Sequence, residues 1–144
     1  LRPPALDELG LVPALESHVR ALSESVGVPI RIEAEPLEVA LSRQAELALY
    51  RIAQEATSNA VRHAEPSRVT IRLRGAGHGV ELEVEDDGRG FHVDQVISTD
   101  DGGLGLFGMQ ERAAYVGGSV DITSRREGGS RGTARIPTDG GGIG

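Results

Sequence analysis

Apolar residues recur every three or four positions in three stretches of this chain, and this spacing predicts helices. The first stretch covers 11–26 and is followed by a glycine, which is a common helix stop. The second covers 42–64, with Ser42 as a suitable N-cap and a Glu-Pro pair directly behind it. The third covers 106–116 and ends at a pair of glycines.

Elsewhere apolar and polar residues alternate, which is typical of half-buried strands. The glycine-rich segment 75–79 joins two of these stretches and predicts a hairpin. A second glycine pair, at 128–129, lies between the last two stretches, which we expect to close the sheet. The expected strands cover 28–35, 69–74, 80–85, 119–124 and 131–136.

Helices placed among mainly antiparallel strands predict an α+β fold. We expect a two-layer α/β sandwich, in which a mixed, mainly antiparallel sheet is covered by helices on one face. Residues 1–137 are expected to form one domain without internal repeats, and the glycine-rich tail 138–144 is expected to be disordered. The segment 91–107 has no periodicity, and we expect it to be mobile.

The composition excludes several classes of function. Fifteen basic and twenty-two acidic residues give a formal net charge of −7. This balance argues against a nucleic-acid partner and against direct contact with an anionic membrane, because both require a basic surface. The absence of cysteine excludes disulfides and cysteine-ligated metals, and it fits a cytoplasmic location. No apolar run approaches the roughly 18 residues of a membrane span.

The second expected helix carries two polar residues on its apolar side. Glu55 and Asn59 lie four residues apart, on or beside the stripe that Ile52 marks and that should meet the sheet. One interpretation is structural, with both side chains bonded to backbone groups at the helix–sheet junction. The other is a Mg²⁺ site, because this ion prefers oxygen ligands and usually keeps water and phosphate among them. Arg62 and His63 would then face phosphate oxygens.

An acidic turn follows the strand expected over 80–85. Asp86 and Asp87 stand directly before Gly88 and Gly90, which let the backbone turn sharply and approach a flat ligand. We predict that the carboxylate of Asp87 accepts a hydrogen bond from an exocyclic amine such as that of adenine. The alternative is an ordinary strand-ending turn, in which Asp-Gly is common. A calcium loop is a poor match, because the later ligand positions carry no suitable oxygen.

The segment Gly103-Leu-Gly-Leu-Phe-Gly108 fits the G-x-G-x-x-G dinucleotide fingerprint. That fingerprint requires a buried strand immediately before it, whereas residues 98–102 here are polar or glycine. A dinucleotide-binding fold is therefore rejected. The segment is instead expected to be a flexible glycine loop that precedes a helix. The free N–H groups at the start of that helix can hold phosphates.

Together these patches resemble the ATP-binding domain shared by gyrase, Hsp90, MutL and sensor histidine kinases. Residues 55–59 resemble its N-box, 87–90 its Asp-x-Gly-x-Gly box, and 103–109 and 129–137 its two later glycine boxes. Within that superfamily the chain is most similar to the NarX/DesK-like histidine kinases. The marks of this likeness are Leu6-Asp-Glu-Leu-Gly-Leu11, Gln54-Glu55-Ala, Asn59-Ala-Val-Arg-His63 and Gly108-Met-Gln-Glu-Arg112.

The resemblance implies a Bergerat-type sandwich that holds ATP between the long helix and a mobile lid. It implies that Asn59 binds Mg²⁺, and that Glu55 beside it helps to position water or the phosphoryl acceptor. It implies that Asp87 binds the adenine amine, that Gly88 and Gly90 shape that pocket, and that Thr133 supports its adenine end. The implied phosphate lid contains Gly103, Leu104, Gly105, Leu106 and Gly108.

In such kinases the phosphoryl acceptor is a histidine, followed by an acid, on a separate helical dimerisation domain. None of the four histidines here is followed by an acid, so we expect the acceptor to lie outside this chain. We expect the isolated domain to be monomeric and to phosphorylate itself poorly. The implied partners are the dimerisation domain and a response regulator, in a parent that is soluble or membrane-anchored. Rival functions are an anti-sigma-type serine kinase and a non-catalytic nucleotide-dependent binding module.

Overall fold

The computed structural model describes residues 3–37, 40–63, 65–77, 79–88, 105–125 and 128–137. The strands in this part of the chain are β1 (Ile30–Ala34), β2 (Val69–Ala76), β3 (Gly79–Asp86), β4 (Ser119–Arg125) and β5 (Gly129–Pro137). The helices are α1 (Pro4–Leu9), α2 (Leu11–Val26), α3 (Arg43–His63) and α5 (Leu106–Tyr115).

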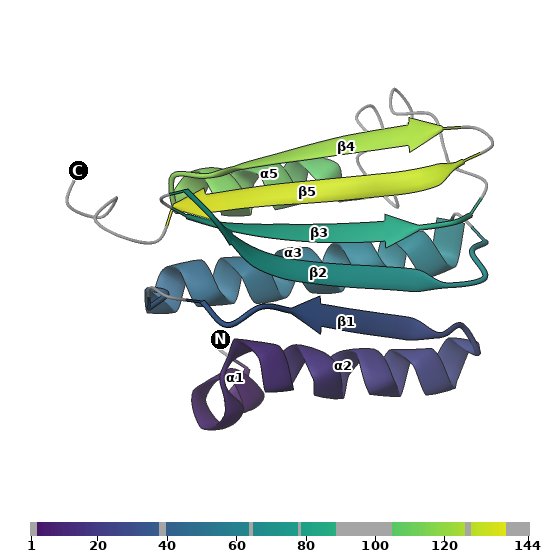
Figure 1. The fold of residues 1–144 in the computed structure, drawn as a ribbon, viewed down its shortest axis with the longest axis horizontal. Coiled ribbons are helices and arrows are strands. Elements are labelled where there is room, and N and C mark those ends of the chain that lie inside the picture. The colour runs from purple at the N-terminus through teal and green to yellow at the C-terminus, as the bar shows by residue number, and fades with distance from the viewer. Residues whose placement is uncertain are drawn as a thin grey trace.

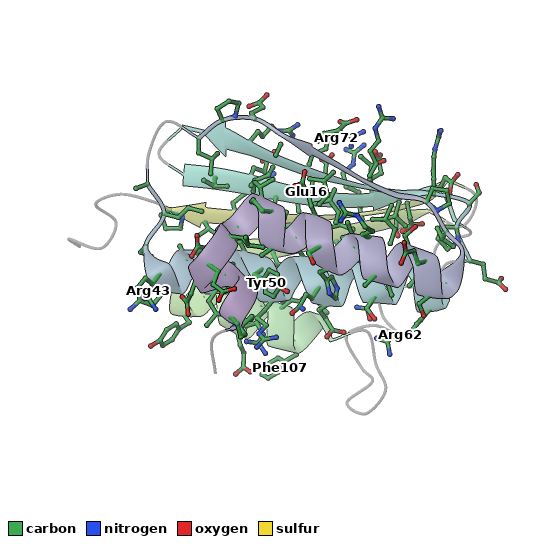
Figure 2. All side chains as sticks on the ribbon, turned by 90° about the horizontal axis from the view of Figure 1, so that it is seen from below. Glu16, Arg43, Tyr50, Arg62, Arg72 and Phe107 are labelled. Atoms are coloured by element: carbon green, nitrogen blue, oxygen red, sulfur yellow. The ribbon has the colours of Figure 1, made fainter. Side chains whose placement is uncertain are left out.

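The strands form one sheet in the order β1-β2-β3-β5-β4. The pair β1–β2 is parallel and the other three pairs are antiparallel. Figure 1 shows α3 and α5 behind this sheet, with α2 beside the edge strand β1. Figure 2 shows the same two layers from below, with Arg72 on the sheet side and Phe107 on the helical side. The predicted two-layer α/β sandwich with a mixed, mainly antiparallel sheet is therefore confirmed.

Most of the predicted elements are present, with small differences at their ends. Helix α2 has the predicted bounds, and Ser42 Oγ accepts a hydrogen bond from the Ala45 N–H at 3.0 Å, as expected of an N-cap. The hairpin turn is tighter than expected, because Ala76 pairs directly with Gly79. The six-residue helix α1 was not predicted, since it is too short to display a periodic pattern.

The hydrophobic core lies between α3 and the sheet. On α3 the apolar stripe is buried as the spacing predicts, with Leu49 fully buried and Ile52 3% exposed. The inward-facing strand residues opposite, among them Ile71 and Leu82, are equally buried. This packing fixes α3 against β3 and β5, and it therefore fixes any polar side chain that points from the helix toward those strands.

The opposite face of the sheet carries a ladder of ion pairs. Arg72 on β2 donates hydrogen bonds to Glu83 and Glu85 on β3, each at 2.8 Å, and to Glu33 on β1 at 3.1 Å. Arg131 on β5 also bonds to Glu85, at 2.9 Å. The hydrogen bonds from Arg72, and then those from Arg131, lower the pKa of Glu85 below its ordinary value.

No helix among the described residues is long and apolar enough to cross a membrane. The tail 138–144 and most of the segment 91–107 lie outside the described residues. Disorder of the first and mobility of the second therefore stay predictions, as does the domain boundary at 137.

Candidate nucleotide-binding site

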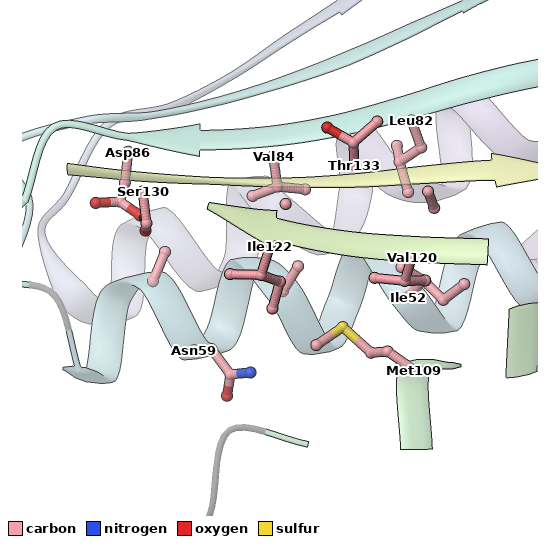
Figure 3. Close-up of a pocket in the computed structure, with 14 residues that line it drawn as sticks. Ile52, Asn59, Leu82, Val84, Asp86, Met109, Val120, Ile122, Ser130 and Thr133 are labelled. Atoms are coloured by element: carbon pink, nitrogen blue, oxygen red, sulfur yellow. Dashed lines mark hydrogen bonds between the residues drawn. The ribbon is translucent and has the colours of Figure 1, made fainter. Parts of the chain in front are cut away.

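A narrow cavity of about 30 Å³ lies between α3 and strands β3, β4 and β5 (Figure 3). Apolar side chains, including Met109 and Ile122, form most of its wall. Four polar residues from three different elements also line it: Asn59 from α3, Asp86 from β3, and Ser130 and Thr133 from β5. A cavity of this size holds about two water molecules. A larger ligand therefore requires flexible side chains such as Met109 to move.

Asp86 supplies the buried carboxylate of this cavity. It ends β3 on the face that also carries Leu82 and Val84, and it is only 6% exposed. Its carboxylate accepts hydrogen bonds from the Ser130 hydroxyl and from the Gly88 N–H, the latter at 2.8 Å. Burial raises the pKa of Asp86 above its ordinary value, and these neutral donors offset the shift only in part. A buried carboxylate without a cationic partner among the described residues is typical of a functional site.

Gly129 lets β5 begin directly beside Asp86. Its φ of +81° lies in the left-handed region that favours glycine. A Cβ atom at this position would stand 2.0 Å from the backbone oxygen of Asp86, which is a severe clash. Glycine is therefore required here, and the next residue, Ser130, is placed opposite Asp86 in the strand register.

The structure does not bring Asp87 to the cavity. Its carboxylate accepts hydrogen bonds from the Ser67 N–H at 2.9 Å, the Arg68 N–H at 3.0 Å and the Ser67 hydroxyl. The bond from the Ser67 hydroxyl is the largest cause of the lowered pKa of Asp87. Asp87 thus ties the connection between α3 and β2 to the end of β3. Successive strand residues point to opposite faces, and this alternation leaves Asp86 as the inward-facing acid.

Thr133 also differs from the expectation. It is among the residues around the cavity, but its partner in the strand register is Glu83, which lies on the outer face of the sheet. Figure 3 shows the Thr133 side chain pointing away from Asn59. The hydroxyl that reaches Asp86 belongs to Ser130, three residues earlier, which the sequence analysis had not assigned to the site.

The C-terminal half of α3 brings Glu55, Asn59 and Arg62 together. Asn59 is 4% exposed, and its Oδ1 accepts a hydrogen bond from an Arg62 amino group at 3.1 Å. The same amino group lies 3.7 Å from Glu55 Oε2. Figure 2 shows Arg62 at the rim of the helical layer. Of the predicted residues on this helix, His63 ends it, and its side chain lies outside the described part of the chain.

Glu55 also lines an open groove between α2, α3 and α5, with a volume of about 590 Å³. Arg51, Gln54 and Arg112 are among the polar residues of this groove, so its chemistry differs from that of the apolar cavity. Asn59 and Glu55, one turn apart, therefore face two different spaces.

The glycine loop enters α5 next to Glu55. Gly105 has a φ of +68°, and a Cβ atom there would stand 2.8 Å from Glu55 Oε2. Leu106 is buried in the core, whereas Gly108 is exposed on α5. Gly88 is buried behind Asp86. The remaining predicted residues, Gly90, Gly103 and Leu104, lie outside the described residues.

The donor atoms at the cavity fit a magnesium ion better than a metal held entirely by protein. Within the described residues, no group of three or more His, Cys, Asp or Glu side chains gathers in a way that could hold an ion. Asn59 at the cavity and Glu55 in the adjacent groove instead each offer a hard oxygen. Mg²⁺ is commonly held by one or two such oxygens together with phosphates and water.

An α/β sandwich with a buried carboxylate and a buried carboxamide around one cavity is compatible with a nucleotide-binding ATPase domain. Residues 44–140 match the family described as "Histidine kinase-, DNA gyrase B-, and HSP90-like ATPase", and the chain belongs to this family. The predicted membership of this ATP-binding superfamily is confirmed.

Sensor histidine kinases are among the similar proteins. The sensor histidine kinase MctS of Rhizobium johnstonii is 39% identical over 137 residues, which cover 95% of this chain and 30% of the relative. The chain thus spans less than a third of that protein's length. The predicted likeness to sensor histidine kinases is confirmed, whereas the NarX/DesK-like subfamily stays a prediction.

Two solved structures share the fold. The histidine kinase domain of a blue-light activated histidine kinase from Erythrobacter litoralis has a TM-score of 0.72 at 22% identity, covering 90% of this chain and 62% of its own. The histidine kinase AdeS of Acinetobacter baumannii also has a TM-score of 0.72, at 15% identity, covering 90% of this chain and 64% of its own.

Proposed function

We propose that this chain is the ATP-binding catalytic domain of a sensor histidine kinase. It binds Mg·ATP and transfers the γ-phosphoryl group to a histidine of a separate helical dimerisation domain, from which a response regulator receives it. The observation that carries the proposal is the shared cavity of Asp86 and Asn59, two buried polar residues on opposing elements. We place the domain in the cytoplasm, where ATP is supplied.

Asp86, rather than Asp87, recognises the purine in this proposal. An ionised carboxylate accepts hydrogen bonds only, so it suits the exocyclic amine of adenine and disfavours the carbonyl oxygen that guanine presents at the same position. Ser130 and Gly88 hold the carboxylate in place by donating to it. The apolar wall with Met109 and Ile122 packs against the ring.

Asn59 lies on the helix that faces the phosphates. Its Oδ1 would hold Mg²⁺, which supplies positive charge that neutralises the phosphates when it is bound. The protein's own contribution is mainly to orient the γ-phosphoryl group and the acceptor. Glu55 faces the groove, so its carboxylate can orient the acceptor imidazole and accept a proton from it.

The proposal is tested by mixing this domain with the histidine-bearing dimerisation domain of its parent and γ-labelled ATP. We expect label on the partner that is lost in acid and stable in base, as for phosphohistidine. Acid-stable label would favour the anti-sigma-type serine kinase instead. ATP binding without any transfer would favour the non-catalytic module. Asn59→Ala should reduce the rate of transfer more than it reduces nucleotide affinity.

A further inference from the structure

Arg62 links the two polar residues on which the proposed chemistry depends. One amino group of its guanidinium lies 3.1 Å from Asn59 Oδ1 and 3.7 Å from Glu55 Oε2. Its Nε donates to the Ser58 carbonyl oxygen at 3.3 Å, which holds the guanidinium along the helix. The Arg62 side chain is 56% exposed, so it can leave this position without disturbing the core.

We propose that Arg62 and Mg²⁺ compete for the oxygen of Asn59, so that Arg62 sets how strongly nucleotide binding depends on magnesium. This inference rests on the proposed function, because it takes Asn59 as the magnesium ligand. It goes beyond that function by giving Arg62 a role as a latch that must open when the metal nucleotide binds.

The competition follows from charge and distance. An ion held by Asn59 Oδ1 would share this oxygen with the Arg62 amino group, which lies 3.1 Å from it, so the two cations would stand close together. At that separation a divalent cation and a guanidinium repel one another strongly. An exposed ion pair is weak, so the metal displaces the arginine rather than the reverse.

Opening the latch also changes Glu55. With Arg62 in place, the Glu55 carboxylate has a cationic neighbour that competes with any other group it could bind. When Arg62 leaves Asn59, Glu55 loses this cationic neighbour and is released toward the groove. Binding of the metal nucleotide and release of the Glu55 carboxylate are thereby coupled through the Arg62 side chain. Arg62 therefore acts as a positioning residue.

The test is calorimetry of AMP-PNP binding with saturating Mg²⁺ and with EDTA, which needs no phosphotransfer. The quantity of interest is the magnesium enhancement, the dissociation constant in EDTA divided by that in Mg²⁺. Arg62→Gln should raise this enhancement roughly two- to six-fold, because the cost of opening a weak surface latch is removed. Arg43→Gln is the matched control, since Arg43 begins the same helix and pairs with Asp7 at 3.4 Å. It should leave the enhancement unchanged.

The outcomes separate this inference from the proposed function. An enhancement that is the same in the wild type and in Arg62→Gln, with Asn59→Ala lowering it, would overturn the latch while leaving the proposed function intact. A wild-type protein that binds AMP-PNP equally well with and without Mg²⁺ would overturn both. A magnesium enhancement that rises in Arg62→Gln and not in Arg43→Gln supports the latch.

Discussion

The hydroxyl of Ser130 donates a hydrogen bond to the carboxylate of Asp86 across the antiparallel pair β3–β5. Both residues line the same cavity, and the carboxylate is almost completely buried. A buried carboxylate is costly unless donors surround it, so this contact favours the ionised form of Asp86 and fixes its orientation. It also identifies Ser130 as the residue of β5 that belongs to the proposed nucleotide site.

Removing the Ser130 hydroxyl should weaken nucleotide binding. Ser130→Ala leaves Asp86 with one fewer donor, and a hydrogen bond to a charged group contributes about 1.5–3 kcal/mol. We expect adenine-nucleotide affinity to fall roughly ten-fold or more. Thr133→Val is the control, because Thr133 pairs with Glu83 on the outer face, and it should retain wild-type affinity in calorimetry. Weaker binding in the Thr133 variant and not in the Ser130 variant would contradict the assignment.

Gly105 and Gly108 should respond oppositely to alanine. Gly105 has a positive φ and would place a Cβ atom against Glu55, so Gly105→Ala should lower the free energy of unfolding by about 1 kcal/mol. No atom of the described part of the chain lies within 4 Å of a Cβ built at Gly108, which is inside α5, so Gly108→Ala should raise that free energy by up to about 1 kcal/mol. Urea unfolding of both variants measures the difference. Equal effects would show that the loop enters α5 differently.

Thr57 offers a stabilising substitution in the core. Its side chain is fully buried, and its hydroxyl oxygen has no hydrogen-bond partner among the described residues. Valine has the same shape without the polar atom, so Thr57→Val should raise the free energy of unfolding by about 1 kcal/mol. Thr57→Ala, which leaves a small cavity, should lower it. A decrease in thermal midpoint for the valine variant would indicate that the hydroxyl has a partner after all.

Acid unfolding should reveal opposite contributions from neighbouring carboxylates. The pKa values of Glu85 and Asp87 are lowered, so their stabilisation is present above the ordinary values of 4.5 and 3.8 and is lost as pH falls through the folded values. The pKa of Asp86 is raised, so its protonation favours the folded state as pH falls. Between about pH 6 and pH 3, Asp86→Asn should therefore lose stability more steeply than wild type, and Glu85→Gln less steeply. Parallel curves for all three proteins would contradict these shifts.

The sequence predicts the fold well because periodicity reports directly which faces are buried. The stripe with Leu49 and Ile52 predicted the packing of α3, and it correctly placed Asn59 on the side of the sheet. Strand alternation likewise predicted the order of elements and the mainly antiparallel sheet. These features depend on local patterns, which can be recognised without knowing which residues pack against them.

Asp87 and Thr133, whose side chains do not lie on the inward face as expected, share one reason for this difference. On a strand, a shift of one position moves a side chain to the other face, so an error of one residue exchanges Asp86 for Asp87. The apolar positions Ile136 and Ala134 extend back with period two to Ser130 rather than to Thr133, so this alternation places Ser130 on the inward face. The pairing of Asp86 with Ser130 depends on register, which no single strand encodes.

Contacts between side chains of different elements were beyond the sequence. The approach of Gly105 to Glu55 requires the positive φ at the start of α5 and the packing of α5 beside α3. The bridge from Arg62 to Asn59 and Glu55 depends on a rotamer that residue spacing leaves open.

The most direct test of the central claim compares Asp86→Asn with Asp87→Asn in calorimetric titrations with Mg·AMP-PNP. We predict that the Asp86 variant loses roughly ten- to a hundred-fold in affinity, the loss expected for one charge-assisted hydrogen bond. The Asp87 variant should bind within about three-fold of wild type and instead unfold at a lower temperature, because Asp87 holds the Ser67 loop. Wild-type affinity in the Asp86 variant, with binding lost in the Asp87 variant, would contradict the account.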